Sequence, residues 1–172
     1  MSKANAERKI YGINACQSFF QRFPERIIRA WITEEAAKIS FGPMMKYLAQ
    51  EKRAYHLADG EELERVTESS HHEGVCLLIQ ELPVFTPESW LAGLKPGKPV
   101  CVLALDGVSN PQNLGAIMRV AAHFGVGAIL TENALALRTG SAMRTAEGGA
   151  THVMVMGTDN LVKTLNLLKR LQ

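Results

Sequence analysis

In the second half of the chain, short apolar runs alternate regularly with segments of helical periodicity. Residues 100–105, 127–130 and 153–156 are short apolar runs typical of buried strands. Residues 113–124 and 159–171 carry apolar side chains at helical spacing. Strands that alternate with helices indicate a parallel, doubly wound sheet. The sequence therefore predicts an α/β domain whose last element within these 172 residues is a crossover helix without a following strand.

The first half also mixes helices and strands, and a Pro/Gly-rich linker separates it from the second half. Residues 94–99 read Leu-Lys-Pro-Gly-Lys-Pro, a composition that favours a loop. We therefore predict two domains, residues 1–95 and residues 96–172. The elements predicted before the linker are helices at 13–23, 43–52 and 61–66, strands at 27–32, 54–57 and 74–79, and a connecting helix capped at Thr86.

The composition is that of a globular protein, with a hydrophobic fraction of 47%. No apolar run approaches the roughly 18–20 residues of a membrane span. The polar residues 1–9 are not followed by the apolar core of a signal peptide, so we expect a cytoplasmic protein. Cys16, Cys76 and Cys101 are far apart in apolar settings, which predicts buried free thiols in a reducing compartment.

The net charge of +2 does not select a partner, but the distribution of charge is uneven. Residues 1–29 carry six Lys/Arg against two acids, residues 30–95 six against eleven, and residues 96–172 seven against four. Basic ends around an acidic middle suit RNA contact at both ends of the chain. They are equally compatible with ordinary solvated surface charge, so both interpretations stay open at this point.

One strand–turn–helix segment carries a specific motif. Residues 106–119, Asp-Gly-Val-Ser-Asn-Pro-Gln-Asn-Leu-Gly-Ala-Ile-Met-Arg, lead from a polar turn into a helix that presents one arginine. Asn113, the pair Gly115-Ala116, Arg119 and the pair Phe124-Gly125 resemble the first motif of the SpoU (TrmH-like) family of the SPOUT superfamily. Members of that family methylate the ribose 2′-hydroxyl of transfer or ribosomal RNA with S-adenosylmethionine. The resemblance implies the same reaction, cofactor and RNA partner for a whole family member.

The resemblance extends over most of the chain. Residues 11–15 resemble the opening of the family's N-terminal substrate-binding domain. Residues 72–75, His-Glu-Gly-Val, resemble its closing His-Gln-Gly-Val, with Glu73 in place of the usual Gln. Residues 141–150 resemble the stretch before the third strand of the methyltransferase domain. The implied fold is an α/β substrate-binding domain of the ribosomal-protein-L30e-like type, followed by the first half of a parallel-sheet SPOUT (α/β knot) methyltransferase domain.

Two further motifs of the family, Gly-Asn-Glu-x-x-Gly and Leu-Asn-x-Ser, do not occur in this sequence, whose last residue is Gln172. In the family they build a C-terminal knot that holds S-adenosylmethionine and much of the homodimer interface. The resemblance therefore implies truncation before the knot, at Gln172, and leaves the cofactor-binding residues unknown. We expect this chain alone to bind no cofactor and to have no activity.

The last predicted helix carries an apolar stripe of Leu161, Leu165, Leu168 and Leu171. With no further strand to pack against, a stripe of this kind suggests self-association.

Arg119 is the candidate catalytic residue, and the family convention makes it the base that activates the 2′-hydroxyl. A guanidinium seldom gives up its proton, so Arg119 could act as a base only if it were buried and stripped of partners. Alternatively it stays charged, orients the adjacent phosphate and stabilises the developing alkoxide, which the physical chemistry favours. Asn113 is predicted to cap the helix, and as a second catalytic-site residue to hold Arg119 or the RNA backbone.

RNA contacts are predicted at basic residues of both halves: Lys9, Arg22, Arg26 and Arg29 in the first, Arg138 and Arg144 in the second, with Arg144 preferred. The histidines at 71–72 have no further ligands at metal-binding spacing, so no metal site is predicted. Two other classes of function stay open. One is an RNA-binding protein that keeps the methyltransferase scaffold without catalysis, and the other is a small nucleotide-binding protein unrelated to RNA.

Overall fold

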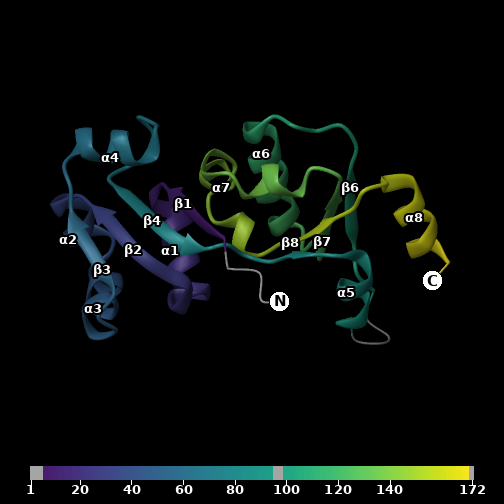
Figure 1. Cartoon of the computed structure of the whole chain (residues 1–172), viewed down its shortest axis with the longest axis horizontal. Coiled ribbons are helices and arrows are strands. Elements are labelled where there is room, and N and C mark those ends of the chain that lie inside the picture. The colour runs from purple at the N-terminus through teal and green to yellow at the C-terminus, as the bar shows by residue number, and fades with distance from the viewer. Residues whose placement is uncertain (1–5, 95–98, 171–172) are drawn as a thin grey trace.

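The computed structural model describes residues 6–94 and 99–170. These residues form two four-stranded sheets that follow one another along the long axis of the molecule, each packed against helices (Figure 1). The elements, with 3-10 helices labelled η, are β1 (Glu7–Tyr11), α1 (Ile13–Arg22), η1 (Pro24–Arg26), β2 (Ile27–Ile32), α2 (Glu34–Ile39), α3 (Gly42–Gln50), β3 (Ala54–Leu57), α4 (Gly60–Thr67), β4 (Val75–Gln80), β5 (Val84–Phe85), α5 (Pro87–Ala92), β6 (Val102–Leu105), α6 (Pro111–His123), β7 (Ala128–Thr131), η2 (Ala134–Arg138), α7 (Gly140–Thr145), η3 (Gly149–Thr151), β8 (Met154–Gly157) and α8 (Leu161–Lys169).

The first sheet has the order β1-β4-β2-β3 and mixed pairing. Strands β1 and β2 run antiparallel to β4, whereas β3 is parallel to β2. Alternate residues of a strand face opposite sides of the sheet. Ile10 and Leu77 are buried on one side in a cluster with Phe19 of α1. On the other side, Cys76 is buried with Leu63 of α4.

The second sheet has the order β5-β8-β7-β6 and all its pairs are parallel, as predicted. One face packs on α6 and α7, where Ile129 and Leu114 are fully buried. The opposite face packs on α5 and α8, where Leu130 is buried with Trp90 and Leu161. The sheet is therefore covered by helices on both faces, which is the usual environment of parallel strands.

The two sheets share one core. The largest buried cluster contains Ile10 and Phe19 of the first part together with Leu114 and Met118 of α6. The backbone is also tightly apposed, since a Cβ on Gly140 at the start of α7 would lie 2.7 Å from the Tyr11 ring. Because β1 and α1 pack directly on α7 and η3, the two parts form one packed unit.

Side-chain caps explain where five of the helices begin. Thr33, Asp59, Thr86, Thr139 and Asn160 each accept a hydrogen bond from the backbone N–H three residues further on. Such caps satisfy N–H groups that have no partner within the helix. The cap predicted at Thr86 is confirmed, and Ser89 completes a capping box there.

Most predicted elements are confirmed, and two strands, β2 and β3, have the predicted bounds. Two strands, β1 and β5, two helices, α2 and α7, and the three 3-10 helices were not predicted. Strand β1 reads Glu-Arg-Lys-Ile-Tyr, a charged segment without clear alternation, and pairing with β4 makes it a strand. Strand β5 has two residues, too few for any pattern to show.

Residues 84–92, which form β5 and α5, belong with the second sheet rather than the first. Strand β5 pairs with β8, and Trp90 of α5 packs beneath the same strands. The domain division predicted at residue 95, which lies outside the described residues, stays a prediction. The pairing of β5 favours a division nearer residue 82.

The cysteine prediction is wrong at one position. Cys16 and Cys76 are buried free thiols, but Cys101 is exposed. Cys101 immediately precedes β6 and therefore lies outside the packed part of the sheet.

The apolar stripe on α8 is partly covered. Leu161 is buried and Leu168 packs on the sheet, whereas Leu165 is exposed. Leu171 and Gln172, where the resemblance implies truncation, lie outside the described residues, so that expectation stays a prediction. Over residues 6–94 and 99–170, no helix is long and apolar enough to cross a membrane.

Candidate functional site

Helix α6 presents Arg119 on its exposed side. Leu114, Gly115 and Met118 face inward and are buried, and Arg119 follows them on the outer face. Gly115 allows α6 to approach α7 closely, because a Cβ there would lie 2.5 Å from the Cβ of Thr145. The small residue of the motif is therefore explained by helix packing, which fixes the position of Arg119.

Arg119 forms an ion pair with Glu147, with 3.0 Å between Nη1 and Oε1. The two side chains are 59% and 46% exposed. Glu147 has a φ of +46°, and Gly148 follows with a φ of +89°. This left-handed turn after α7 carries the carboxylate toward α6. Arg119 is therefore neither buried nor without partners, which are the two conditions that a basic, deprotonated arginine requires.

Asn113 was predicted to cap α6, but it is the third residue of the helix. The helix begins at Pro111, and Asn110 is the cap, accepting hydrogen bonds from the backbone N–H groups of Gln112 at 2.9 Å and Asn113 at 3.2 Å. The prediction that Asn113 is the cap is therefore wrong. Proline suits the first helical position because its missing N–H would have no partner there. The helix therefore begins at Pro111, two residues earlier than predicted. Asn113 itself is exposed.

A hollow of about 320 Å³ lies beside Arg119. Phe124 and Val120 are 77% and 55% exposed there, and the rings of His123 and Phe124 meet edge to face with centroids 5.2 Å apart. Asn113 does not line this hollow. The lining residues are Arg119, Val120, His123, Phe124, Ala146, Glu147 and Gly149.

A second ion pair links the two parts of the chain. It joins Arg144 of α7 to Glu73, with 3.4 Å between Nη1 and Oε1. The other carboxylate oxygen of Glu73 accepts a 2.8 Å hydrogen bond from the backbone N–H of Ile13, at the start of α1. Arg144, predicted to contact RNA, thus joins the two parts of the chain, and its side chain is 29% exposed. Glu73 makes this pair in the position where the family usually has Gln.

Polar contacts also join α1 to the segment after Glu147. The Ser18 hydroxyl donates to the Gly148 carbonyl at 3.1 Å and lies 2.6 Å from the Thr151 hydroxyl. Arg22 donates to Nδ1 of His152 at 3.2 Å. The turn that carries Glu147 is therefore held on one side by α6 and on the other by α1.

The structure contradicts the predicted RNA contact of Arg138. Its side chain is buried, with 3% exposure, and Nη2 donates to the Pro83 carbonyl at 3.3 Å. The Nε and Nη1 atoms have no partner, and burial lowers the pKa of Arg138 to about 10. Arg138 follows an apolar stretch of η2, so packing against the segment before β5 removes it from the surface.

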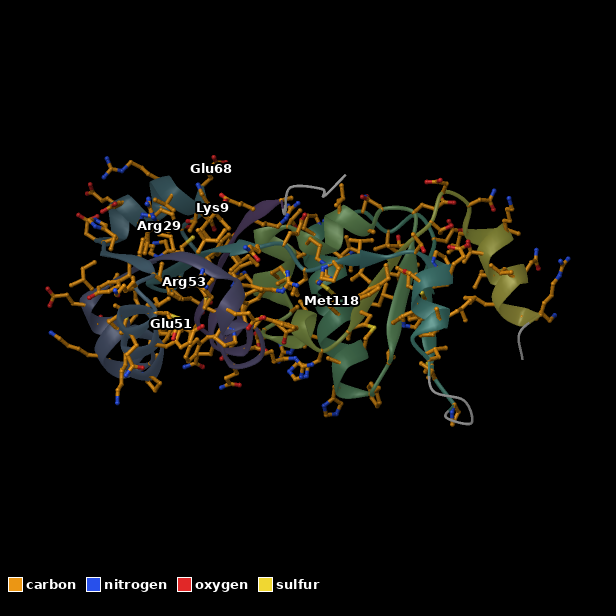
Figure 2. The ribbon with its side chains drawn as sticks, turned by 60° about the horizontal axis from the view of Figure 1, so that its bottom comes forward. Lys9, Arg29, Glu51, Arg53, Glu68 and Met118 are labelled. Carbon is orange, nitrogen blue, oxygen red and sulfur yellow. The ribbon has the colours of Figure 1, made fainter. Side chains whose placement is uncertain are left out.

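Arg26 and Arg29 belong to the first part of the chain and do not join Arg119. Arg29 is exposed on β2 and its guanidinium lies 5.6 Å from the centroid of the Trp31 ring. Arg26 is half-buried and donates to the Glu81 carbonyl at 3.3 Å. Figure 2 shows Arg29 far from Met118, the residue before Arg119, along the long axis of the molecule.

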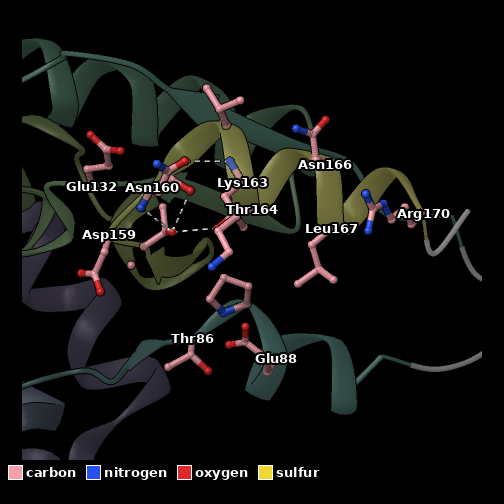
Figure 3. Close-up of a pocket in the computed structure, with 14 residues that line it drawn as sticks. Thr86, Glu88, Glu132, Asp159, Asn160, Lys163, Thr164, Asn166, Leu167 and Arg170 are labelled. Carbon is pink, nitrogen blue, oxygen red and sulfur yellow. Dashed lines mark hydrogen bonds between the residues drawn. The ribbon is translucent and has the colours of Figure 1, made fainter.

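A larger groove, of about 1030 Å³, lies between α5 and α8 (Figure 3). The carboxyl ends of β5, β7 and β8 open into it, which is where parallel sheets usually hold ligands. Glu132 accepts a 2.9 Å hydrogen bond from the Leu161 N–H, and the hydroxyls of Thr158 and Thr164 are 2.7 Å apart. Over the described residues, no cluster of three or more His, Cys, Asp or Glu could hold a metal ion.

The sequence missed Glu147, Glu73 and Ser18. Glu147 precedes two glycines, a signal for an unusual turn, but its distance to Arg119 depends on how α7 packs on α6. Glu73 was visible as a departure from Gln, although its partner was not. Nothing in the sequence around Ser18 indicated its contacts with Gly148 and Thr151.

The two parts of the chain match two family models. Residues 9–85 match the RNA 2′-O ribose methyltransferase substrate-binding family, and residues 100–172 match the SpoU rRNA Methylase family. The chain is 42% identical over 160 residues to YfiF, an uncharacterized tRNA/rRNA methyltransferase of Escherichia coli O157:H7, in a match covering 93% of this chain and 46% of that protein. It thus spans about half the length of the curated relatives it matches first.

Solved structures share the fold. The crystal structure of an RNA 2′-O ribose methyltransferase superposes with a TM-score of 0.73 at 18% identity, over 96% of this chain and 60% of the other. The SpoU methyltransferase AviRb of Streptomyces viridochromogenes, solved in complex with AdoMet, gives a TM-score of 0.68 at 12% identity, over 95% and 60%. The two family matches, over residues 9–85 and 100–172, show that the chain belongs to the SpoU/TrmH family of RNA 2′-O-ribose methyltransferases and includes their N-terminal substrate-binding domain.

Proposed function

We propose that this chain binds transfer or ribosomal RNA and contributes the substrate-activating side of a ribose 2′-O-methylation site. The observation that carries the proposal is the position of Arg119. It is exposed beside a hollow, at the junction where the substrate-binding part packs against α6 and η3. In this proposal an RNA held by the first part extends to Arg119 across that junction.

Arg119 acts in this proposal as a charged clamp. Its guanidinium orients a phosphate next to the target ribose and stabilises negative charge that develops on the 2′-oxygen. Glu147 holds the guanidinium in place before RNA arrives, at a distance of 3.0 Å. An RNA phosphate then competes with Glu147 for the donors of Arg119, which has five N–H groups to share.

S-adenosylmethionine is the methyl donor in this proposal and would supply an electrophilic methyl group. The groove between α5 and α8 is of ligand size, since pockets commonly span about 300–1,000 Å³. Its polar side chains nevertheless pair with the chain itself, as Glu132 and Thr158 do. No buried, partnerless polar side-chain atom of the described residues lines it. These residues do not by themselves fit the cofactor, so we assign none of them to it.

RNA binding is tested by filter binding of labelled ribosomal and transfer RNA, with DNA of equal length as competitor. We expect tighter binding of RNA and a linear fall of log affinity with log salt, because phosphate contacts release counterions. Arg119→Ala should weaken binding and reduce the salt slope by about one phosphate contact. Equal binding of RNA and DNA would overturn the proposed function.

Methyl transfer is tested separately. Calorimetry of the 172-residue chain with S-adenosylmethionine should show no micromolar binding, because the family's cofactor motifs do not occur between Met1 and Gln172. Micromolar affinity, or transfer of a tritiated methyl group to RNA by this chain alone, would contradict that expectation and assign it a complete site.

One observation favours the second candidate, an RNA-binding protein without catalysis. Arg119 is already paired with a carboxylate, and the pair must open before Arg119 can act on RNA. For an RNA-binding protein without catalysis, Glu147→Gln should strengthen RNA binding, and no methyl transfer to RNA should be detected with S-adenosylmethionine present. If Glu147→Gln leaves RNA affinity unchanged, phosphate does not compete for Arg119 and the clamp mechanism fails for both candidates.

A further inference from the structure

We infer that the hollow beside Arg119 is a nucleotide-binding site that takes one unstacked base on Phe124 and an adjacent backbone phosphate on Arg22 and His152. The site spans both parts of the chain. This inference rests on the proposed RNA binding and deepens it, because it names the residues that read the strand and the kind of RNA that fits.

The first observation is a solvent-exposed aromatic ring. Phe124 is 77% exposed, although it directly follows α6 and adjoins a well-packed core. His123 meets it edge to face, with centroids 5.2 Å apart, so the two rings support each other. Val120, four residues before Phe124 on α6, adds an exposed apolar surface next to the ring. A flat ring with an open face is what a nucleobase stacks on.

The second observation is the shape beside the ring. Gly149 packs on the backbone of α6 so closely that a Cβ would lie 2.8 Å from the Cα of Arg119. Because Gly149 and Ala146 place almost no side chain there, the surface stays concave, with a volume of about 320 Å³. This is near the lower end of the range of ligand pockets, about 300–1,000 Å³. The hollow therefore has room for a base and ribose rather than for a helix or a strand.

The third observation is the charge around the hollow. Glu147 is the one carboxylate among its described lining residues, and Arg119 already engages it. Arg22 and His152 are exposed and joined at 3.2 Å, and the backbone N–H of His152 donates to the Gly149 carbonyl at 2.9 Å. His152 therefore lies one 3-10 turn after Gly149, which lines the hollow, and Arg22 contacts the His152 ring.

Arg22 has donors left over for an anion, since one guanidinium nitrogen contacts His152. Guanidinium and imidazole N–H groups both bind phosphate oxygens, and Arg does so in a forked geometry. Arg22 belongs to α1 and His152 follows η3, so a phosphate bound between them also bridges the two parts of the chain. The exposed ring, the small hollow beside it and the phosphate donors together suit single-stranded RNA, because its bases can turn out of the stack.

The experiment measures binding of the full chain to a single-stranded 12-nucleotide RNA that carries 2-aminopurine, whose fluorescence is quenched by stacking. We expect wild type to quench it and Phe124→Ala to bind about tenfold more weakly, the order of loss when a stacking ring is removed. Phe124→Trp should keep the quenching, whereas Phe124→Leu should lose it, because Leu retains apolar bulk without a ring. Arg22→Ala should weaken binding of all sequences and reduce the salt slope by about one.

Two matched controls lie outside the site. Ile39 is an equally exposed apolar residue on α2, and Arg65 is an exposed arginine on α4. Ile39→Ala and Arg65→Ala should bind RNA as wild type does. Thermal melts of all variants check folding, which the exposed position of Phe124 leaves intact.

The outcomes separate this inference from the proposed function. If wild type prefers RNA but Phe124→Ala and Arg22→Ala bind like wild type, this site is overturned and the proposed function stands. If wild type does not distinguish RNA from DNA, both fall. If Phe124→Ala changes the molecular mass by light scattering while RNA affinity stays constant, a second copy of the chain covers the ring, and the nucleotide site is overturned.

Discussion

The ion pair between Arg119 and Glu147 contributes little to stability. Both side chains are about half exposed, and pairs of this kind contribute about 0–1 kcal/mol because water screens them. Its effect is geometric, since it keeps the guanidinium at one edge of the hollow. Arg119 could be predicted from the sequence, because a short local motif carries it. Glu147 could not, because 28 residues and a helix packing separate the two.

Arg138 gives a prediction about a buried charge. Arg138→Met should leave the free energy of unfolding unchanged or raise it by about 1 kcal/mol, because it removes a charge with two partnerless nitrogens and keeps the bulk. Arg138→Ala should lower it by about 2 kcal/mol by leaving a cavity. Urea denaturation measures both. Equal losses in the two variants would show that the charge itself stabilises the fold.

The sign of the pH effect follows from the lowered pKa of Arg138, about 10. The folded state disfavours the proton, so the charged side chain costs stability at every pH below about 10. The cost declines as pH rises above 10 toward the usual pKa of arginine. The advantage of Arg138→Met over wild type should therefore be constant from pH 6 to 9 and shrink above pH 10.

The cysteines give a prediction about reactivity. Burial raises the pKa of Cys76 to about 12 and that of Cys16 well above its usual value, whereas Cys101 is exposed. Since the thiolate is the reactive form, a thiol reagent at pH 8 should modify Cys101 alone in the native protein and all three in guanidinium chloride. Cys101→Ser should abolish the fast reaction. A second fast thiol in native wild type would contradict the burial of Cys16 and Cys76.

These buried thiols also affect stability at high pH. In the unfolded chain a cysteine ionises near pH 8.5, but the folded state holds the proton of Cys76 up to about pH 12. The stability from protonated thiols is therefore fully present below about pH 8.5 and is lost as pH rises toward 12.

Among the elements, the turn that links α7 to η3 depends most on its neighbours. Gly148 has a φ of +89°, and a Cβ there would lie 2.8 Å from the Cβ of Ser18 in α1. Gly148→Ala should therefore lower the free energy of unfolding by about 2–3 kcal/mol, through backbone strain and crowding against α1. Chemical denaturation checks the value, and RNA binding of the same variant reports any displacement of Glu147.

Gly107 is the matched control for Gly148. Its φ is +65°, but a Cβ there would meet nothing within 4 Å. Gly107→Ala should cost about 1 kcal/mol, from backbone strain alone. If the two variants lose the same stability, α1 does not constrain the turn, and the tight junction between α1 and η3 is refuted.

The elements that could be predicted are those with a local signal. Strand β2 is an apolar run interrupted only by Arg29, and α5 begins at Pro87 directly after its threonine cap. Strand β1 could not be predicted, because its charged residues become a strand by pairing with β4, more than 60 residues away. The start of α6 was placed two residues late, because Asn110 and Asn113 are both good caps and Pro111 decides between them.

At the scale of the whole molecule, the shared core predicts a single unfolding transition. Buried residues of both sheets belong to one cluster, so neither part can unfold without exposing the other. The two tryptophans allow a direct test, because Trp31 lies in the first sheet and Trp90 packs under the second. In the single-tryptophan variants Trp90→Phe and Trp31→Phe, fluorescence should give coincident thermal midpoints after correction for the stability of each variant.

Separate transitions would contradict this prediction. If the Trp31 and Trp90 signals change at midpoints more than a few degrees apart, the two parts unfold independently. The interface would then be a contact between separate domains, and the first part could move relative to Arg119. Circular dichroism of wild type supplies the reference curve for both variants.

The family, the parallel second sheet and the place of Arg119 on its helix can all be inferred from local motifs and hydrophobic periodicity. Which charged side chains remain accessible to a ligand depends instead on tertiary packing. It buries Arg138, pairs Arg144 with Glu73 and Arg119 with Glu147, and leaves Phe124 in water beside a hollow. Burial and charge pairing depend on which residues distant in the chain meet in space, and that information emerges only when α1, α6 and α7 pack together.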